Sequence, residues 1–90
     1  MEEIIRFFLT SGAKAKDEAH WVVGVLAEDT EALTLFRDAI RAAINQKAAG
    51  NPNKARKLFY AMSDTARNIF GDTYEQVRKD FDRASRAASK

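Results

Sequence analysis

The clearest pattern of hydrophobic and polar positions lies between residues 29 and 52. Large apolar side chains recur there at steps of three and four, at Leu33, Phe36, Ile40 and Ile44. Side chains at these steps share one face of an α-helix, so the pattern predicts a helix over residues 30–49. Asp29 or Thr30 can accept a hydrogen bond as its N-cap. Gly50 can adopt the left-handed conformation that closes a helix, and a proline follows two residues later.

Two more helices are predicted in the second half of the chain. Asn51 can cap a helix over residues 52–70, whose first residue is a proline and needs no N–H there. The apolar stripe of this helix is Ala55, Leu58, Phe59, Met62, Ala66, Ile69 and Phe70. Asp72, with Glu75 three residues later, fits the capping box of a helix over residues 73–88. The stripe of that helix is Tyr74, Val77, Phe81, Ala84 and Ala88.

The first third of the chain is less regular. Helical steps over residues 3–10 connect Ile4, Phe7 and Phe8, and over residues 14–27 they connect Ala15, Ala19, Val22, Val23 and Leu26. The β-branched run around Gly24 also fits a different structure, a hairpin that pairs residues 3–9 with residues 20–27. We favour two helices because neither apolar run alternates with period two.

These segments together predict an all-α fold class, a compact bundle of four to five helices joined by short loops. Loops of this length place helices that are neighbours in sequence side by side and antiparallel. A chain of 90 residues supports one core, so residues 1–90 form a single helical domain. The content of 46% hydrophobic and 31% charged residues is ordinary for a soluble globular protein, and the absence of cysteine excludes disulfides.

Charge is unevenly distributed, although the net charge is only +2. Residues 1–31 carry three basic and seven acidic side chains, whereas residues 32–90 carry twelve and six. A candidate basic face in the second half consists of Lys54, Arg56, Lys57, Arg78, Arg83 and Arg86. Two pairs of opposite charge stand one turn apart in the order that favours ion pairing, Glu75 with Lys79 and Asp82 with Arg86. Nucleic-acid binding is the less favoured use of this face, because acidic residues among the basic ones repel phosphate.

The sequence contains no group of residues typical of a catalytic or metal site. There is a single histidine, His20, and no cysteine to accompany it as a nucleophile or a zinc ligand. A lone histidine beside Trp21 is more typical of a surface or partly buried position than of a catalytic centre. We therefore expect no enzymatic activity, no catalytic residue, no metal ion and no cofactor.

Protein–protein interaction is the functional class that the sequence leaves open. Many large aromatic side chains compete for one small core, namely Phe7, Phe8, Trp21, Phe59, Tyr60 and Tyr74. An uncovered aromatic group, or the stripe of residues 74–88, can bind a helical partner or a second copy of the chain. The apolar runs are too short for a bilayer and the first residues are acidic, so we expect no membrane association and, by default, a cytoplasmic location.

In organisation alone, the chain resembles a designed helical protein. It has capping and stop signals at most helix ends, short loops, one proline and no cysteine. No stretch resembles a natural family. The resemblance implies a self-contained helical scaffold without ligand or catalysis, and the alternative is a small adaptor that presents a helix face or forms a homodimer. An apolar face left uncovered in the monomer favours the adaptor, whereas complete burial of the apolar side chains favours the scaffold.

Overall fold

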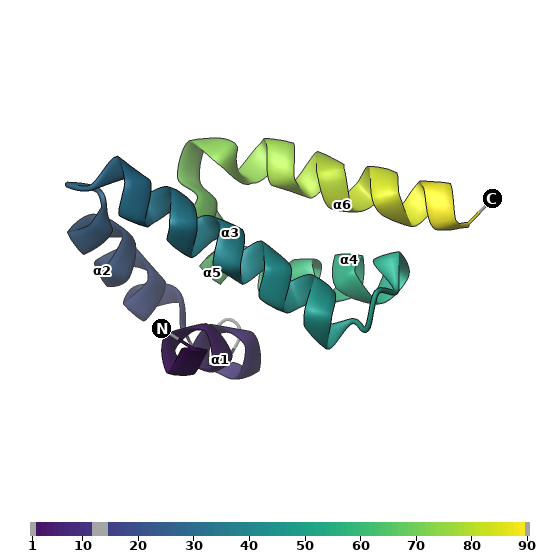
Figure 1. Cartoon of the computed structure of the whole chain (residues 1–90), viewed down its shortest axis with the longest axis horizontal. Helices are drawn as coiled ribbons and strands as arrows, with labels where there is room; N and C mark the ends of the chain where they lie inside the picture. Colours follow the sequence, from purple (N-terminus) through teal and green to yellow (C-terminus); the bar gives the residue numbers. More distant parts are fainter. Residues whose placement is uncertain (1, 12–14, 90) are drawn as a thin grey trace.

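The computed structural model describes residues 2–11 and 15–89, and its regular structure there is entirely helical (Figure 1). The elements are α1 (Glu2–Ser11), α2 (Lys16–Leu26), α3 (Thr30–Lys47), α4 (Pro52–Ala61), α5 (Ser63–Phe70), the 3-10 segment η2 (Gly71–Thr73) and α6 (Tyr74–Ala88). The all-α prediction is confirmed. The alternative hairpin is wrong, because its two segments fall in α1 and α2. Residue 14, the predicted start of the second helix, and the side chain of Ile4 lie outside the described part of the chain.

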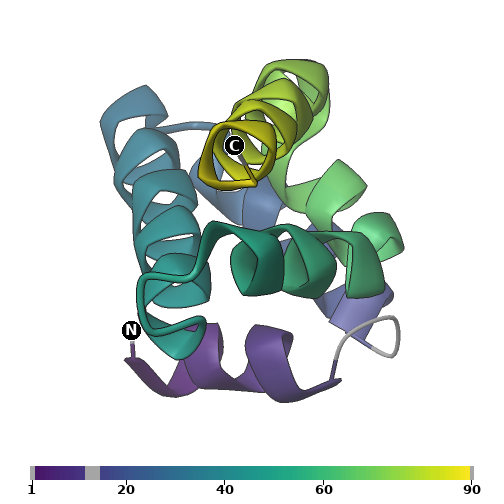
Figure 2. The same ribbon diagram turned by 90° about the vertical axis from the view of Figure 1, so that its right-hand side faces the viewer.

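The long helix α3 crosses the middle of the molecule and packs against α1, α2 and α4 (Figure 1). In Figure 2, α6 lies above α4 and α1 lies below it. The most extensive packing joins α2 to α5 and α4 to α6, which are not neighbours in sequence. The predicted antiparallel pairing of sequential helices is therefore wrong for α1, which packs chiefly on α3. The globule measures 42 × 22 × 19 Å.

The core is built from one face of each helix. Its largest fully buried apolar side chains are Phe8, Phe36, Ile40, Ile44, Phe59, Ile69 and Phe70. Phe8 packs edge-on against Phe36, with 5.8 Å between ring centroids, and so attaches α1 to α3. Phe59 on α4 stacks on Phe81 at 4.9 Å and on Tyr74 at 5.5 Å, which attaches α4 to α6. These aromatic contacts bury Tyr74 and Phe81, the two aromatic residues of the predicted α6 stripe, within the monomer.

The predicted helix over residues 52–70 is interrupted at Met62. This residue has φ −111° and ψ 32°, outside the helical region, so α4 ends at Ala61 and α5 begins at Ser63. The backbone N–H of Met62 bonds to the carbonyl of Phe59 at 3.3 Å, and its own carbonyl accepts the N–H of Ala66. The interruption redirects the chain so that α4 can pack on α6 while α5 packs on α2.

The caps of the two central helices confirm the sequence prediction at their N-termini. The Asp29 carboxylate accepts the N–H of Ala32 at 3.1 Å, and the Asn51 side chain accepts the N–H groups of the first turn of α4. At the end of α3 the left-handed position begins one residue earlier than predicted. Ala49 has φ +53° and Gly50 has φ +77°. The N–H of Gly50 bonds to the carbonyl of Asn45, and that of Ala49 to the carbonyl of Gln46, which is a Schellman closure.

Two predicted features of the last helix are wrong, its capping box and the C-terminal part of its buried stripe. Asp72 lies in η2 and caps nothing, because the N-cap is Thr73, which has helical dihedrals and no side-chain cap bond. Ala84 and Ala88 are exposed rather than part of a buried stripe. Beyond Phe81 the inner edge of α6 instead passes through Asp82 and Ser85, which form polar contacts with α4.

Candidate functional site

The predicted basic residues lie on two helices that pack together: α4 carries Lys54, Arg56 and Lys57, and α6 carries Arg78, Arg83 and Arg86. Two of the six are neutralised by acidic side chains on α6. Arg56 bonds to Asp82 at 2.8 Å, and Arg78 bonds to both Glu75 at 2.8 Å and Asp82 at 3.1 Å. These ion pairs replace the two predicted from one-turn spacing. The face is therefore a mixed, salt-bridged surface.

Asp82 is the centre of this polar network. Its side chain is only 16% exposed and accepts hydrogen bonds from Arg56, Arg78 and the Tyr60 hydroxyl, the last at 3.0 Å. The guanidinium of Arg56 also lies over the Tyr60 ring, 4.8 Å from its centroid. Partial burial by itself would raise the pKa of the Asp82 carboxyl. The hydrogen bonds from Arg56 and Tyr60 and the charges of Arg56 and Arg78 outweigh that effect, so its pKa lies below the usual value.

We predict that Asp82→Asn lowers the free energy of unfolding by about 1–2 kcal/mol at neutral pH, because two arginines and Tyr60 lose a charged acceptor. A carboxyl whose pKa is lowered on folding stabilises the protein above its unfolded pKa of about 3.9 and loses that contribution as the pH falls through its folded pKa. The difference in free energy of unfolding between wild type and Asp82→Asn should therefore shrink below about pH 4. Urea unfolding between neutral pH and about pH 3 measures it.

Asp38→Asn is the matched control, since Asp38 is an exposed residue of α3 that forms no salt bridge with the described residues. It should change stability by less than about 0.5 kcal/mol at any pH. A difference between wild type and Asp82→Asn that stayed constant down to about pH 3 would contradict a role for the Asp82 charge.

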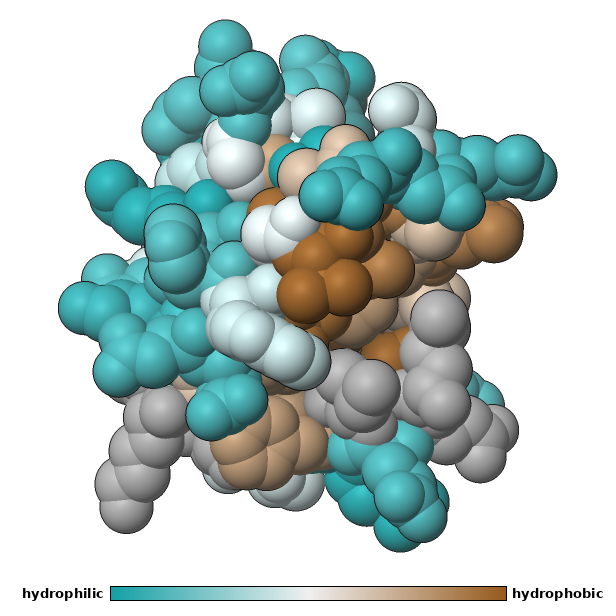
Figure 3. All heavy atoms as spheres, turned by 90° about the vertical axis from the view of Figure 1, so that its left-hand side faces the viewer, coloured by the Kyte–Doolittle hydropathy of each residue, from teal (hydrophilic) through white to brown (hydrophobic). Residues whose placement is uncertain are grey.

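A second candidate surface is apolar and lies at the opposite end of the sequence. Phe7 on α1 is 42% exposed, Trp21 and Val25 on α2 are 66% and 57% exposed, and Leu35 on α3 is 58% exposed. These are the large hydrophobic side chains exposed in the described part of the chain. Figure 3 shows apolar side chains gathered in the middle of this end of the molecule, with polar ones around them. We call Phe7, Trp21, Val22 and Val25 the α1–α2 patch.

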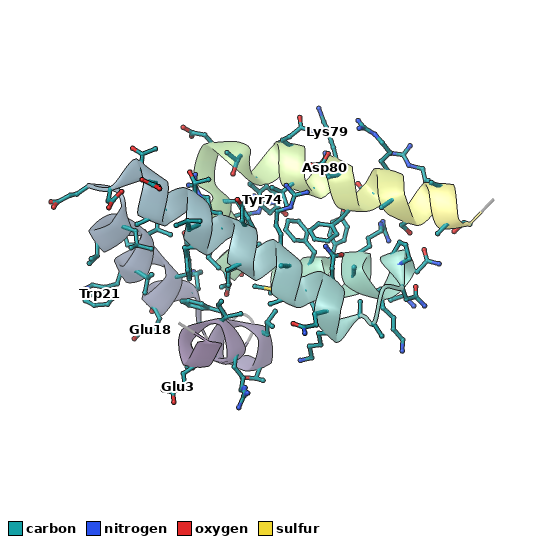
Figure 4. All side chains as sticks on the ribbon, in the orientation of Figure 1. Glu3, Glu18, Trp21, Tyr74, Lys79 and Asp80 are labelled. Carbon is teal, nitrogen blue, oxygen red and sulfur yellow. The ribbon has the colours of Figure 1, made fainter. Side chains whose placement is uncertain are left out.

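The position of the patch follows from how α2 packs. Ala19 is the only residue of the helix that is fully buried. Trp21, two residues further along, faces nearly the opposite direction, so its ring points away from the body of the molecule (Figure 4). Glu18, Trp21 and Val25 are exposed and follow the steps of three and four that define one helix face, and the half-buried Val22 lies at the edge of that face.

A shallow hollow between α1 and α2 forms part of this patch. It encloses about 270 Å³ and is lined by Glu3, Phe7, Phe8, Glu18, Trp21 and Val22. Phe7 packs edge-on against the buried Phe8, with 5.6 Å between centroids, which connects the floor of the hollow to the core. The hollow thus combines a fixed apolar floor with two carboxylates at its edge.

The aromatic side chains divide between core and surface. Phe8, Phe59 and Tyr74 are buried and Tyr60 is half-buried, whereas Phe7 and Trp21 are left uncovered. Both belong to the six aromatic residues identified from the sequence as competing for the core, but Val25 and Leu35 were missed. The spacing of Val25 four residues after Trp21 is the signal that could have found it.

The lone histidine and the acidic side chains form no cluster suited to a metal ion in the part of the chain that the structure describes. His20 is exposed on α2, and no group of three or more His, Cys, Asp or Glu side chains in residues 2–11 and 15–89 could hold a metal ion. Within the same ranges, no helix combines the length and hydropathy that crossing a bilayer requires.

The functional proposal below is based on the structure. No family model, no curated protein and no solved structure matches this chain.

Proposed function

We propose that this protein is a small interaction module that binds a helical segment of another protein through the α1–α2 patch. The observation that carries the proposal is the exposure of Trp21, 66% of whose surface faces solvent beside Val25 and Phe7. Burial of apolar surface favours association, and tryptophan is over-represented among the residues that dominate binding energy. A shallow apolar hollow between two helices suits an amphipathic helix as its ligand.

Other interaction surfaces receive less support. The α6 stripe that was a candidate for self-association packs Tyr74 and Phe81 on Phe59 inside the monomer. The basic face carries the acceptors Glu75 and Asp82 among its arginines, which weakens any attraction to nucleic acid. The competing proposal is a self-contained, designed scaffold, which predicts no specific ligand for any face.

Selection of helical peptides from a displayed library tests the proposal. Wild-type protein would be the bait, and binders would then be screened against the double variant Trp21→Ser/Val25→Ser, with circular dichroism to verify that the variant folds. The proposal predicts families of peptides that bind wild type and lose at least about tenfold in affinity for the variant, equivalent to about 1.4 kcal/mol. Binders that do not distinguish the two proteins, or no binders at all, would contradict it.

A further inference from the structure

The edge of the α1–α2 hollow is acidic. Glu3 from α1 and Glu18 from α2 both line it, beside Phe7 and Trp21. Figure 4 shows Glu3, Glu18 and Trp21 projecting outward at the end of the molecule where α1 and α2 lie. Neither carboxylate forms a salt bridge with any residue that the structure describes. An apolar floor with two negative charges at its edge selects among ligands by charge as well as by hydrophobicity.

The same charges disfavour a second copy of this chain as the ligand. A symmetric dimer through the α1–α2 patch would bring like patches together and place the carboxylates of Glu3 and Glu18 near those of the other copy. The patch could instead contact the basic residues on α4 and α6 of a second copy. That contact would lack an apolar anchor, because none of the large exposed hydrophobic side chains described lies on α4 or α6. The negative charges of Glu3 and Glu18 also repel an anionic lipid surface.

From this geometry we infer that the ligand of the α1–α2 patch is an amphipathic helix whose apolar anchor residues are flanked by lysine or arginine. The anchors occupy the hollow beside Trp21, and the flanking cations pair with Glu3 and Glu18. This inference rests on the proposed function and specifies the chemistry of the partner. Basic flanking residues add specificity and association rate more than affinity, because both carboxylates are exposed to solvent.

The test uses two synthetic helical peptides of about 18 residues that lack tryptophan and carry leucine at identical helical positions. One has lysine and the other glutamate at the polar positions. Trp21 is the only tryptophan of the chain, so a blue shift of its emission reports occupation of the hollow directly. The basic peptide should bind at least about tenfold more tightly than the acidic one at low ionic strength, and added salt should narrow the difference.

Charge reversal at the hollow supplies the decisive comparison. Glu3→Lys/Glu18→Lys should abolish or invert the preference for the basic peptide. The matched control Glu28→Lys/Glu31→Lys makes the same change in net charge at two exposed acids that do not line the hollow, and it should retain most of the preference.

Three outcomes would overturn the inference. If both peptides bind wild type equally, the patch binds helices but the basic partner is wrong and the proposed function stands. If neither peptide shifts the Trp21 emission, the inference and the proposed helix-binding function both fail. If anionic phospholipid vesicles shift the emission and the basic peptide does not, the patch is a membrane-binding surface.

Discussion

Replacing Phe59 with alanine is expected to lower the free energy of unfolding by about 3–5 kcal/mol, the range for removal of a fully buried phenylalanine. Phe59 is completely inaccessible to solvent, and its ring contacts Phe81, Tyr74 and Phe70 at centroid distances of 4.9, 5.5 and 6.1 Å. These rings come from α4, α5 and α6, so the cavity would open where three helices meet. Denaturant unfolding followed by circular dichroism measures the loss.

Phe7→Ala is the matched control for this prediction. It makes the same substitution at a ring that is 42% exposed, and it should cost about 1 kcal/mol or less. A domain of this size has a total stability of about 5–15 kcal/mol, so the Phe59 variant should lose a large share of it while the Phe7 variant loses little. Equal losses for the two variants would contradict the placement of the core.

The second large effect is expected at Gly71, where alanine should lower the free energy of unfolding by about 1–3 kcal/mol. Gly71 joins α5 to η2 with φ +49° and ψ −120°, a combination that residues with a Cβ atom rarely adopt. An added Cβ would also lie 3.3 Å from Nη2 of Arg37. The same guanidinium donates through Nε to the carbonyl of Ile69 at 2.8 Å, so displacing it would disturb the bond between α3 and the end of α5.

Gly24→Ala is the matched control for Gly71→Ala, because it makes the same substitution at a glycine without backbone strain. Gly24 lies within α2 without a positive φ, and a Cβ there would meet nothing within 4 Å. Alanine is the better helix former, so the free energy of unfolding of this variant should rise by about 0.5–1 kcal/mol, as measured by denaturant unfolding. If Gly71→Ala were as stable as wild type, the turn before α6 would not have the conformation described.

The helices with strong end signals could be predicted from the sequence. Residues 30–49 combine a regular apolar face with Asp29 before them and Gly50 after them, and the structure places α3 there with the expected N-cap. Local signals of this kind act within one helix, so they do not depend on the rest of the fold. The class of the fold follows from several such segments in a chain that is too short for a second core.

Features that depend on contacts between distant segments could not be predicted. The apolar stripe runs continuously across Met62, and only the packing of α4 on α6 and of α5 on α2 requires a break there. Ser63 and Asp64 after Met62 are residues that favour helix starts, but the apolar stripe continues past them without a break. Likewise, Asp82 pairs with Arg78 on its own helix and with Arg56 on α4 rather than with Arg86, and only the packing of α4 beside α6 brings Arg56 within reach.

The candidate site was partly visible in the sequence. An excess of aromatic residues was evident, and Phe7 and Trp21 prove to be the uncovered ones. Which aromatic groups stay outside depends on the direction in which α2 packs, and this is determined by the buried Ala19 rather than by Trp21 itself. The acidic character of the first third of the chain was also evident. Only the fold shows that two of these acids, Glu3 and Glu18, line an apolar hollow beside Trp21.

Acrylamide quenching of Trp21 fluorescence, at a low and a high protein concentration, tests the central claim most directly. The claim is that the free protein leaves the α1–α2 patch open to solvent, with Trp21 66% exposed. It predicts strong quenching at both concentrations, with no protection as the protein is concentrated. Weak quenching at both would mean that the ring is buried within the monomer, and protection that grows with concentration would mean that a second copy covers the patch. Either result would contradict a binding face kept free for a basic helix.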